Sequence, residues 1–252
     1  MKQQQNAPVS ANGRAWVEID RQALRENAKT LLALCPKGCR LMPAVKANAY
    51  GHGAVGVARE LNQIGVNAFC VACVSEGVEL RKGRIKGDIL ILGYTHPDDF
   101  TLLHRYRLTQ TVIDAAYAKQ LNRYGKKLAV HIGIDTGMRR LGEKSENTDA
   151  ILSVFRMKNL IVNGIYSHLC DDDSLTEESR AFTEKQAAAF EQTVAEIQKQ
   201  GIPRPKTHLL SSYGAIHYPQ YGGDHLRAGI ALYGIIRKKA DADECPVPLI
   251  PT

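Results

Sequence analysis

The stretch PAVKANAYGHG, from Pro43 to Gly53, ends an apolar run in a single lysine and continues into a loop broken by two glycines. Burying an ammonium group without a partner is strongly unfavourable. The same burial lowers the pKa of an amine and makes it a nucleophile that can form a Schiff base. A lysine at a strand end can equally direct its ammonium group outward into solvent. The sequence around Lys46 must therefore indicate whether this residue is a surface lysine or a reactive one.

Short apolar runs alternate with longer amphipathic segments along the chain. The predicted strands are residues 41–45, 68–73, 89–92, 108–113, 128–134, 161–167, 207–211 and 225–228. The clearest predicted helices are residues 54–64, 115–124 and 177–200. Eight strands that alternate with helices predict an α/β fold, a TIM (β/α)8 barrel with its active site at the C-terminal strand ends. A doubly wound open sheet is the alternative, but no GxGxxG motif follows an early strand.

Five of the predicted strands are followed at once by residues that carry chemistry. In chain order these residues are Lys46 with Tyr50, the motif DTGMRRLG at 135–142, His168, the turn SSYG at 211–214, and RAGI at 227–230. Because the C-terminal ends of barrel strands share one mouth, we expect these groups to converge. Loops after the last two strands often hold a phosphate, where Gly229 leaves backbone N–H groups accessible and Ser212 adds a hydroxyl.

The motifs AWVEID, VKANAYGHG, DTGMRRLG, YSHL, LSS and LRAGIALYG occur in the order seen in the alanine racemase family, which the chain resembles from Arg14 to about Gly234. The segment GIYSHLCDDDSLTEESRAFTEKQ is similar to the racemase domains of membrane-bound serine/alanine racemases of the vancomycin-resistance type. The resemblance implies an isomerase that interconverts the L and D forms of alanine or serine for peptidoglycan precursors. It also implies pyridoxal 5′-phosphate as the cofactor and a homodimeric full-length protein.

The same resemblance implies a role for each residue of the site. Lys46 forms the internal aldimine with pyridoxal phosphate and is one of two bases that exchange the proton at Cα. Arg227 faces the pyridine nitrogen, and His168 supports the ring and Arg227. Arg140 bonds near the phenolic oxygen of the cofactor and contacts the substrate. The phosphate is bound by Tyr50, Ser212, Gly229 and Ile230.

The arginine has a physical rationale of its own. A guanidinium group does not give up its proton, so it donates a hydrogen bond to the pyridine nitrogen without protonating the ring. A neutral pyridine is a weaker electron sink than a pyridinium, which disfavours transamination and leaves proton exchange at Cα. Many pyridoxal enzymes place an aspartate at this position instead.

Two departures from the family pattern limit the expected activity. Many alanine racemases carry a carbamylated lysine where this chain has Gly133, so Arg140 needs another neighbour, either a bound anion or a different side chain. The family continues into a β-rich C-terminal domain that supplies a tyrosine as the second base across the dimer, whereas this chain stops at Thr252. We therefore expect it to bind pyridoxal phosphate through Lys46 and to racemise poorly.

The expected organisation is a disordered leader at 1–12, the barrel at 13–234 and a linker into the β-domain at 235–252. A ninth predicted strand, residues 14–20, is one more than a barrel uses, and we expect it to pair in the absent sheet. No run of about 18 apolar residues occurs, so we expect no membrane segment in this chain. A cytoplasmic protein, or the cytoplasmic domain of a membrane protein, is predicted.

Other functions are disfavoured by missing motifs. The formal charge of +7 comes from scattered basic residues without a nucleic-acid-binding motif, so we expect no nucleic-acid partner. Cys70 and Cys73 have no second CxxC to complete a zinc site, and we expect core thiols.

Two single motifs allow other interpretations, and one alternative function concerns the whole barrel. The acidic run after His168 lacks a second histidine at ligand spacing, so we expect it to cap the helix after Thr176 and predict no metal. Ser212 and His208 lack the GxSxG elbow of a hydrolase. The remaining alternative function is a non-catalytic pyridoxal-phosphate-binding barrel, a class of similar size whose cofactor lysine also ends the first strand.

Overall fold

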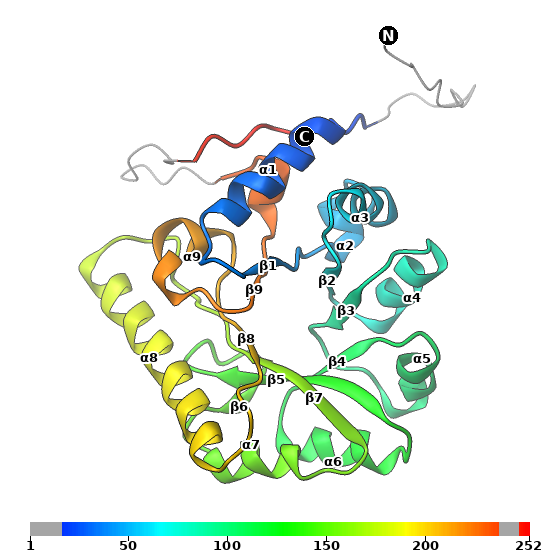
Figure 1. The fold of residues 1–252 in the computed structure, drawn as a ribbon, viewed down its shortest axis with the longest axis vertical. Helices are drawn as coiled ribbons and strands as arrows, with labels where there is room; N and C mark the ends of the chain where they lie inside the picture. The colour runs from blue at the N-terminus through cyan, green and yellow to red at the C-terminus, as the bar shows by residue number, and fades with distance from the viewer. Residues whose placement is uncertain (1–16, 237–246) are drawn as a thin grey trace.

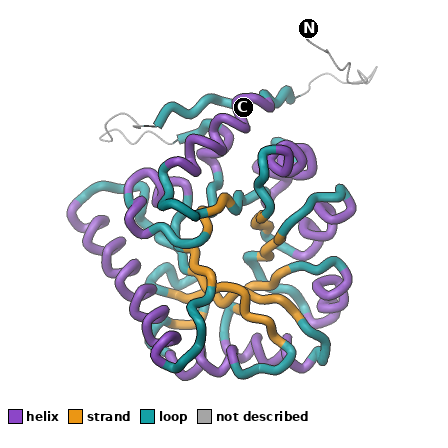
Figure 2. The backbone as a smooth tube through the Cα atoms, in the orientation of Figure 1, coloured by secondary structure: helices purple, strands orange, loops and turns teal. Residues whose placement is uncertain are grey.

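The computed structural model describes residues 17–236 and 247–252, and its strands form a ring with helices outside it (Figures 1 and 2). The strands are β1 (Arg40–Leu41), β2 (Ala68–Val71), β3 (Asp88–Ile91), β4 (Thr109–Val112), β5 (Leu128–Asp135), β6 (Glu143–Lys144), β7 (Leu160–Tyr166), β8 (Lys206–His208) and β9 (His225–Leu226). The helices are α1 (Arg21–Ala33), α2 (Lys46–Tyr50), α3 (Ala54–Gln63), α4 (Val74–Lys82), α5 (Phe100–Arg105), α6 (Ala115–Arg123), α7 (Thr148–Phe155), α8 (Glu177–Lys199) and α9 (Ser212–His217). Three short 3-10 turns are η1 (Pro97–Asp99), η2 (Pro219–Tyr221) and η3 (Ile230–Tyr233).

Eight parallel strands make up the ring in the order β1-β2-β3-β4-β5-β7-β8-β9. Six of them, β2 to β8 without β6, pair side by side, and β1 pairs with β9. A parallel bridge between Ala44 and Cys70 joins the chain after β1 to β2. The Arg227 N–H donates to the Leu210 carbonyl at 3.1 Å and joins the chain after β9 to the chain after β8. The predicted TIM barrel is confirmed, and each predicted strand overlaps the observed one.

Apolar side chains on the two faces of the strands fill two separate spaces. Met42, Ala44, Ala68, Cys70 and Leu90 form a small cluster of their own. The alternate residues on β2 and β3 belong instead to the large core that includes side chains of the surrounding helices. This division is expected for a barrel, because successive side chains on a strand point to the lumen and to the outer helices in turn. Cys70 is buried as predicted, whereas Cys73 is half-buried at the start of α4, so the prediction of a core thiol there is wrong.

The helix α1 precedes the first strand and packs against α3, α9 and η3 on the outside of the ring. Asp20 caps it, because its Oδ1 accepts the N–H groups of Gln22 at 2.8 Å and Ala23 at 3.0 Å. Residues 17–20 have no regular secondary structure, so the predicted strand at 14–20 is wrong in its described part, and residues 14–16 lie outside the described residues. No strand continues to Asp20, because Asp20 starts a helix whose apolar face is buried.

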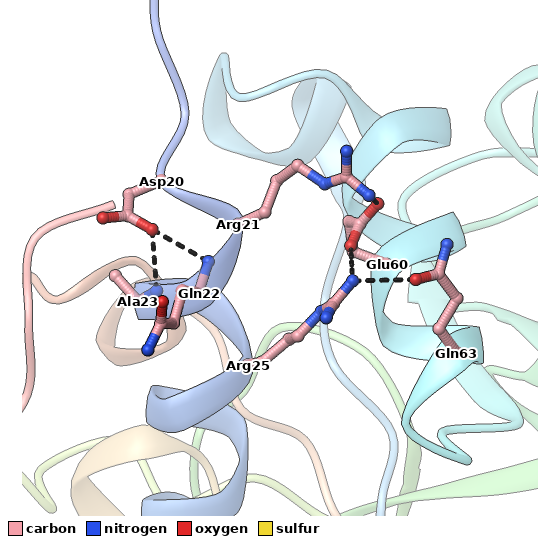
Figure 3. A network of polar contacts seen from close by, with 7 residues as sticks. All are labelled: Asp20, Arg21, Gln22, Ala23, Arg25, Glu60 and Gln63. Atoms are coloured by element: carbon pink, nitrogen blue, oxygen red, sulfur yellow. Dashed lines mark hydrogen bonds and ion pairs between the residues drawn. The ribbon is translucent and has the colours of Figure 1, made fainter. Parts of the chain in front are cut away.

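Two arginines of α1 tie this helix to α3 through one carboxylate (Figure 3). Arg21 and Arg25 both form ion pairs with Glu60, and Arg25 also donates to Gln63 at 2.7 Å. Burial raises the pKa of Glu60, but hydrogen bonds from the two arginines and their charges lower it overall. The tie therefore fixes the helix before β1 to the helix after the Lys46 loop.

The predicted helices at 54–64, 115–124 and 177–200 match α3, α6 and α8 to within one residue at each end. Thr176 itself caps α8, because its side chain accepts the Ser179 N–H, so the prediction that the acidic run caps this helix is wrong. Of the predicted tail at 235–252, the described part returns to α1, where Asn27 bonds both the N–H and the carbonyl of Ile250, at 2.8 and 2.7 Å. The leader at 1–12 lies outside the described residues. Among the helices of the described part, none has the length and apolarity needed to cross a bilayer.

Candidate active site

A cavity of about 640 Å³ opens at the C-terminal ends of the strands. Its lining includes all eight residues predicted for the site, namely Lys46, Tyr50, Arg140, His168, Ser212, Arg227, Gly229 and Ile230. These residues come from five different strand ends, and the barrel brings them to one mouth. The convergence expected from the order of the strands is therefore what the fold produces.

Lys46 stands at the start of a left-handed turn that follows β1. Ala47, Asn48, Ala49 and Tyr50 have φ between 51° and 55°, and ψ of the first three lies between 45° and 49°. This conformation costs an L-residue roughly 1–2 kcal/mol, so four in succession need outside support. Asn48 supplies part of it, because its Oδ1 accepts the Ala54 N–H at 2.9 Å. The turn leaves Lys46 half-buried on the cavity wall.

The same turn carries Tyr50 across to the loops after β8 and β9. Ser212 accepts the Gly229 N–H on its Oγ at 2.8 Å. A Cβ atom added at Gly229 would lie 3.1 Å from the Tyr50 hydroxyl and 3.8 Å from Ser212 Oγ. Two hydroxyl groups thus converge on the space at Gly229, and a side chain there would crowd the Tyr50 hydroxyl. Burial raises the pKa of Tyr50, so its hydroxyl stays protonated and can donate.

Arg227 is buried, and each of its hydrogen-bond acceptors is uncharged. Its Nη1 donates to His208 Nδ1 and to the His208 carbonyl, both at 2.7 Å. Its Nη2 donates to the carbonyls of Ser167 at 2.6 Å and Leu209 at 3.0 Å. The guanidinium lies over the Tyr166 ring, 4.9 Å from its centre. The arrangement fixes a cation beside the cavity without a carboxylate on any of these four bonds.

These bonds determine the hydrogen positions on two histidines. Because His208 Nδ1 accepts from Arg227, the hydrogen of a neutral His208 is on Nε2, which then donates to His131 Nδ1 at 2.8 Å. Burial, with Arg227 and neighbouring histidines, lowers the pKa of His208 well below 6.5. Burial first, and nearby cationic groups next, lower the pKa of His131 to about 3. Both rings are therefore neutral near pH 7, and His208 supports the cation by accepting from it.

His208 corrects the sequence interpretation, which considered it only as a partner for Ser212. Its ring bonds Arg227 and His131 and stacks on Tyr166 with a centroid distance of 4.8 Å. The signal in the sequence is its place on an inward position of the seventh predicted strand, next to the strand that carries Arg227.

His168 contributes a ring nitrogen rather than a bond to Arg227. Its Nδ1 is buried and has no hydrogen-bond partner among the described residues. Burial, with the cationic Arg227, Arg140 and Lys46 nearby, lowers the pKa of His168 to about 3. A neutral imidazole with an unused nitrogen thus borders the cavity.

Arg140 lies on the rim of the cavity and is exposed. In the part of the chain that the structure describes, its side chain has no hydrogen bond or ion pair. The turn that carries it is fixed by Asp135, whose Oδ1 accepts the N–H groups of Gly137 at 2.9 Å and Arg139 at 3.0 Å. Gly133 lines the same cavity, and a Cβ there would lie 3.4 Å from Thr111 Cγ2. Among the described residues, no side chain bonds Arg140 in place of the lysine that is missing at Gly133.

Asp172 is a site residue that sequence reasoning assigned elsewhere. The acidic run was expected to cap α8, but the Asp172 carboxylate accepts the Ser211 hydroxyl at 2.8 Å at the start of α9. Its carbonyl accepts from His217 Nδ1 at 2.7 Å, at the other end of α9. Burial raises the pKa of this carboxyl group. Asp172 thereby fixes the helix that begins with Ser212.

The barrel, the lysine on its rim and the hydroxyl-lined recess opposite define a family. Residues 19–237 match the model of the alanine racemase N-terminal domain, and the chain belongs to this family. The resemblance seen in the motifs is confirmed.

Two individual relatives are similar to nearly the whole of this chain. An amino-acid racemase of Enterococcus faecalis is 40% identical over 238 residues, which are 94% of this chain and 34% of that protein. A serine/alanine racemase of Enterococcus gallinarum is 39% identical over 250 residues, 99% of this chain and 35% of that protein. This chain therefore spans about a third of the length of these relatives.

The fold is shared with solved structures. An alanine racemase of Clostridium difficile 630 in complex with cycloserine aligns with a TM-score of 0.88 and 30% identity, covering 95% of this chain and 66% of that chain.

Proposed function

We propose that this chain is the cofactor-binding barrel of a pyridoxal-phosphate-dependent amino-acid racemase, an isomerase that acts on alanine or serine. The observation that carries the proposal is that Lys46 and the recess formed by Tyr50, Ser212 and Gly229 line the same cavity. The similarity to a serine/alanine racemase of Enterococcus gallinarum supports the two substrates. The same proposal includes supply of the D-amino acid for peptidoglycan precursors, as in racemases of the vancomycin-resistance type.

The residues present fit this cofactor. The hydroxyls of Tyr50 and Ser212 and the backbone near Gly229 and Ile230 suit a phosphate, because they offer hydrogen-bond donors in an uncrowded recess. The unused Nδ1 of His168 borders the space for the ring. Lys46 supplies the amine for the covalent link, and Arg140 lies on the rim, where an amino-acid carboxylate would enter.

When bound, pyridoxal phosphate makes the Cα–H bond of an attached amino acid acidic. Arg227 keeps its proton and donates hydrogen bonds only, so it limits how far negative charge moves into a pyridine ring. His208 and His131 maintain this state, because the neutral His208 ring accepts from Arg227 and donates to the neutral His131 ring, and neither ring adds a second cation. The arrangement favours return of the proton to Cα.

Lys46 takes or returns the Cα proton on one face of the substrate, and inversion requires a second base on the other face. We infer that this base lies outside the 252 residues, since the chain spans about a third of its first relatives. In this proposal the barrel pairs with a second protomer, and a further domain completes the site. The barrel corresponds to residues 13–234, and 235–252 lead into that domain.

The test is the position of the covalent link. The chain is incubated with pyridoxal phosphate, reduced with borohydride and mapped by peptide mass spectrometry. We expect pyridoxyl on the peptide that contains Lys46, none in Lys46→Ala, and an unchanged pattern in the exposed-lysine control Lys82→Ala. Labelling elsewhere, or none, contradicts the proposal.

A further inference from the structure

The carboxylate of Glu76 connects the loop after Lys46 to the end of β2. Glu76 lies in the first turn of α4. Its Oε1 accepts the Ala47 N–H at 2.8 Å, and its Oε2 accepts the Ala72 N–H at 2.6 Å. Ala47 directly follows Lys46, and Ala72 directly follows β2. One side chain therefore fixes two neighbouring strand ends beside the lysine.

Helix capping accounts for only one of these two bonds. A glutamate in the first turn commonly reaches back to a backbone N–H at the start of its own helix. The bond from Ala72 to Oε2 is similar to such a cap, because Ala72 directly precedes Cys73, the N-cap of α4. The bond from Ala47 to Oε1 joins a segment 29 residues away and has no part in capping.

The Ala47 N–H begins the left-handed turn, in which four residues other than glycine have positive φ. The side chain of Asn48, the second residue of this turn, accepts the Ala54 N–H and ties the turn to the start of α3. Glu76 is the tie at the near end, one residue from Lys46. Without the bond to Glu76, Ala47 would relax to the negative φ that is lower in energy for alanine. The direction of the Lys46 side chain would then change.

We propose that Glu76 is a positioning residue for Lys46. Its carboxylate holds the left-handed turn against the end of β2 and thereby directs the Lys46 amine into the cavity. This inference rests on the proposed role of Lys46 as the cofactor lysine.

The experiment compares Glu76→Gln with Glu79→Gln. Glutamine has one acceptor oxygen, and its amide group meets the second N–H, so one of the two bonds is lost. Glu79 is exposed on the same helix, and its side chain has no hydrogen bond or ion pair within the described part of the chain. The readout is the fraction of Lys46 that carries pyridoxyl after borohydride reduction, measured against pyridoxal phosphate concentration, with thermal unfolding followed by circular dichroism.

We expect Glu76→Gln to need a concentration higher by about tenfold for half-labelling of Lys46, as for the loss of a hydrogen bond to a charged group. Glu79→Gln is expected to label like the wild type. Equal labelling of Glu76→Gln and wild type overturns this inference alone, whereas absence of label at Lys46 in the wild type overturns the proposed function.

A rescue variant separates positioning from helix capping. Ala47→Gly accepts positive φ without strain, so it should restore labelling in the Glu76→Gln background by at least half of the lost factor. A cap of α4 would gain nothing from glycine at position 47. If Glu76→Gln lowers labelling or prevents folding and Ala47→Gly restores neither, Glu76 serves only α4 and the inference is wrong.

Discussion

Tyr50 reaches the recess at Gly229 only because the residues before it adopt positive φ. An ordinary right-handed turn after Lys46 would place this ring elsewhere, so a backbone feature determines which hydroxyl faces Gly229. The ring is also held by Tyr233, with 5.6 Å between the ring centres. Removal of the Tyr50 hydroxyl should therefore change ligand binding more than folding.

Tyr50→Phe deletes this hydroxyl and keeps the ring. We expect the dissociation constant for pyridoxal phosphate to rise about tenfold, because a hydrogen bond to a charged phosphate contributes roughly 1.5–3 kcal/mol. Spectrophotometric titration measures it, and Tyr94→Phe, an exposed tyrosine with 47% of its surface accessible, serves as the control. An unchanged dissociation constant in Tyr50→Phe would remove this tyrosine from the site.

The positions of single residues were predictable where a motif carried them, and their contacts were not where the fold alone brings the partners together. All eight predicted residues line the cavity because each follows a strand end, a property visible in the sequence. The roles of Glu76 and Asp172 were missed because they bind backbone or hydroxyl groups that are distant in the sequence. The contact of His208 with Arg227 was missed because no motif marks it, although the two residues lie on adjacent predicted strands.

At the scale of elements, the barrel strands were predictable because strands buried on both faces appear as short apolar runs. The left-handed turn at Ala47–Tyr50 was not, since Ala-Asn-Ala-Tyr contains no glycine and its conformation depends on ties from Glu76 and Asn48. The strand predicted at residues 14–20 is wrong in its described part for a local reason. The alternating pattern favoured a strand there, whereas Asp20 caps a helix.

The tie between α1 and α3 gives a prediction about stability. Glu60→Gln removes the charge shared by Arg21 and Arg25, and we expect the free energy of unfolding at pH 7 to fall by about 1–2 kcal/mol, since both arginines are partly solvent-screened. The folded pKa of Glu60 is lowered, so its contribution is present above the unfolded pKa and is lost as the pH falls toward the folded one.

Urea unfolding of Glu60→Gln at pH 7 and at pH 4 measures the loss of unfolding free energy and its dependence on pH. The difference from wild type should be smaller at pH 4, and Glu79→Gln should differ little at either pH. A difference that grows toward acid would contradict the lowered pKa of Glu60.

At the scale of the whole molecule, the barrel holds several neutral histidines beside a buried cation. Burial is the main cause that lowers the pKa of His131 and His168 to about 3 and that of His225 to about 4. The unfolded chain binds protons on these residues near pH 6.5, and the folded chain does not. The unfolded state therefore gains protons first, and stability falls as the pH drops below 6.5.

His225→Gln isolates one contribution, because His225 lies outside the bonded chain of Arg227, His208 and His131. Between pH 6 and pH 4.5 the slope of unfolding free energy against pH should be smaller than in wild type by about 1.4 kcal/mol per unit. Urea titrations across this range give the slope. An equal slope in the two proteins would mean that His225 titrates normally in the folded state.

The division of the two bases gives a prediction about turnover. If Lys46 acts on one face and the other base lies outside these residues, the 252-residue chain can exchange the Cα proton with solvent on one face and cannot efficiently deliver it to the other. In deuterium oxide with pyridoxal phosphate, we expect one enantiomer of alanine or serine to gain deuterium at Cα at least about tenfold faster than it is inverted, a barrier difference of about 1.4 kcal/mol. Mass spectrometry measures exchange, chiral chromatography measures inversion, and Lys46→Ala should abolish both. Exchange and inversion at equal rates would place both bases within this chain, and Tyr166, whose ring lines the cavity beside Arg227, would then be the first residue to replace.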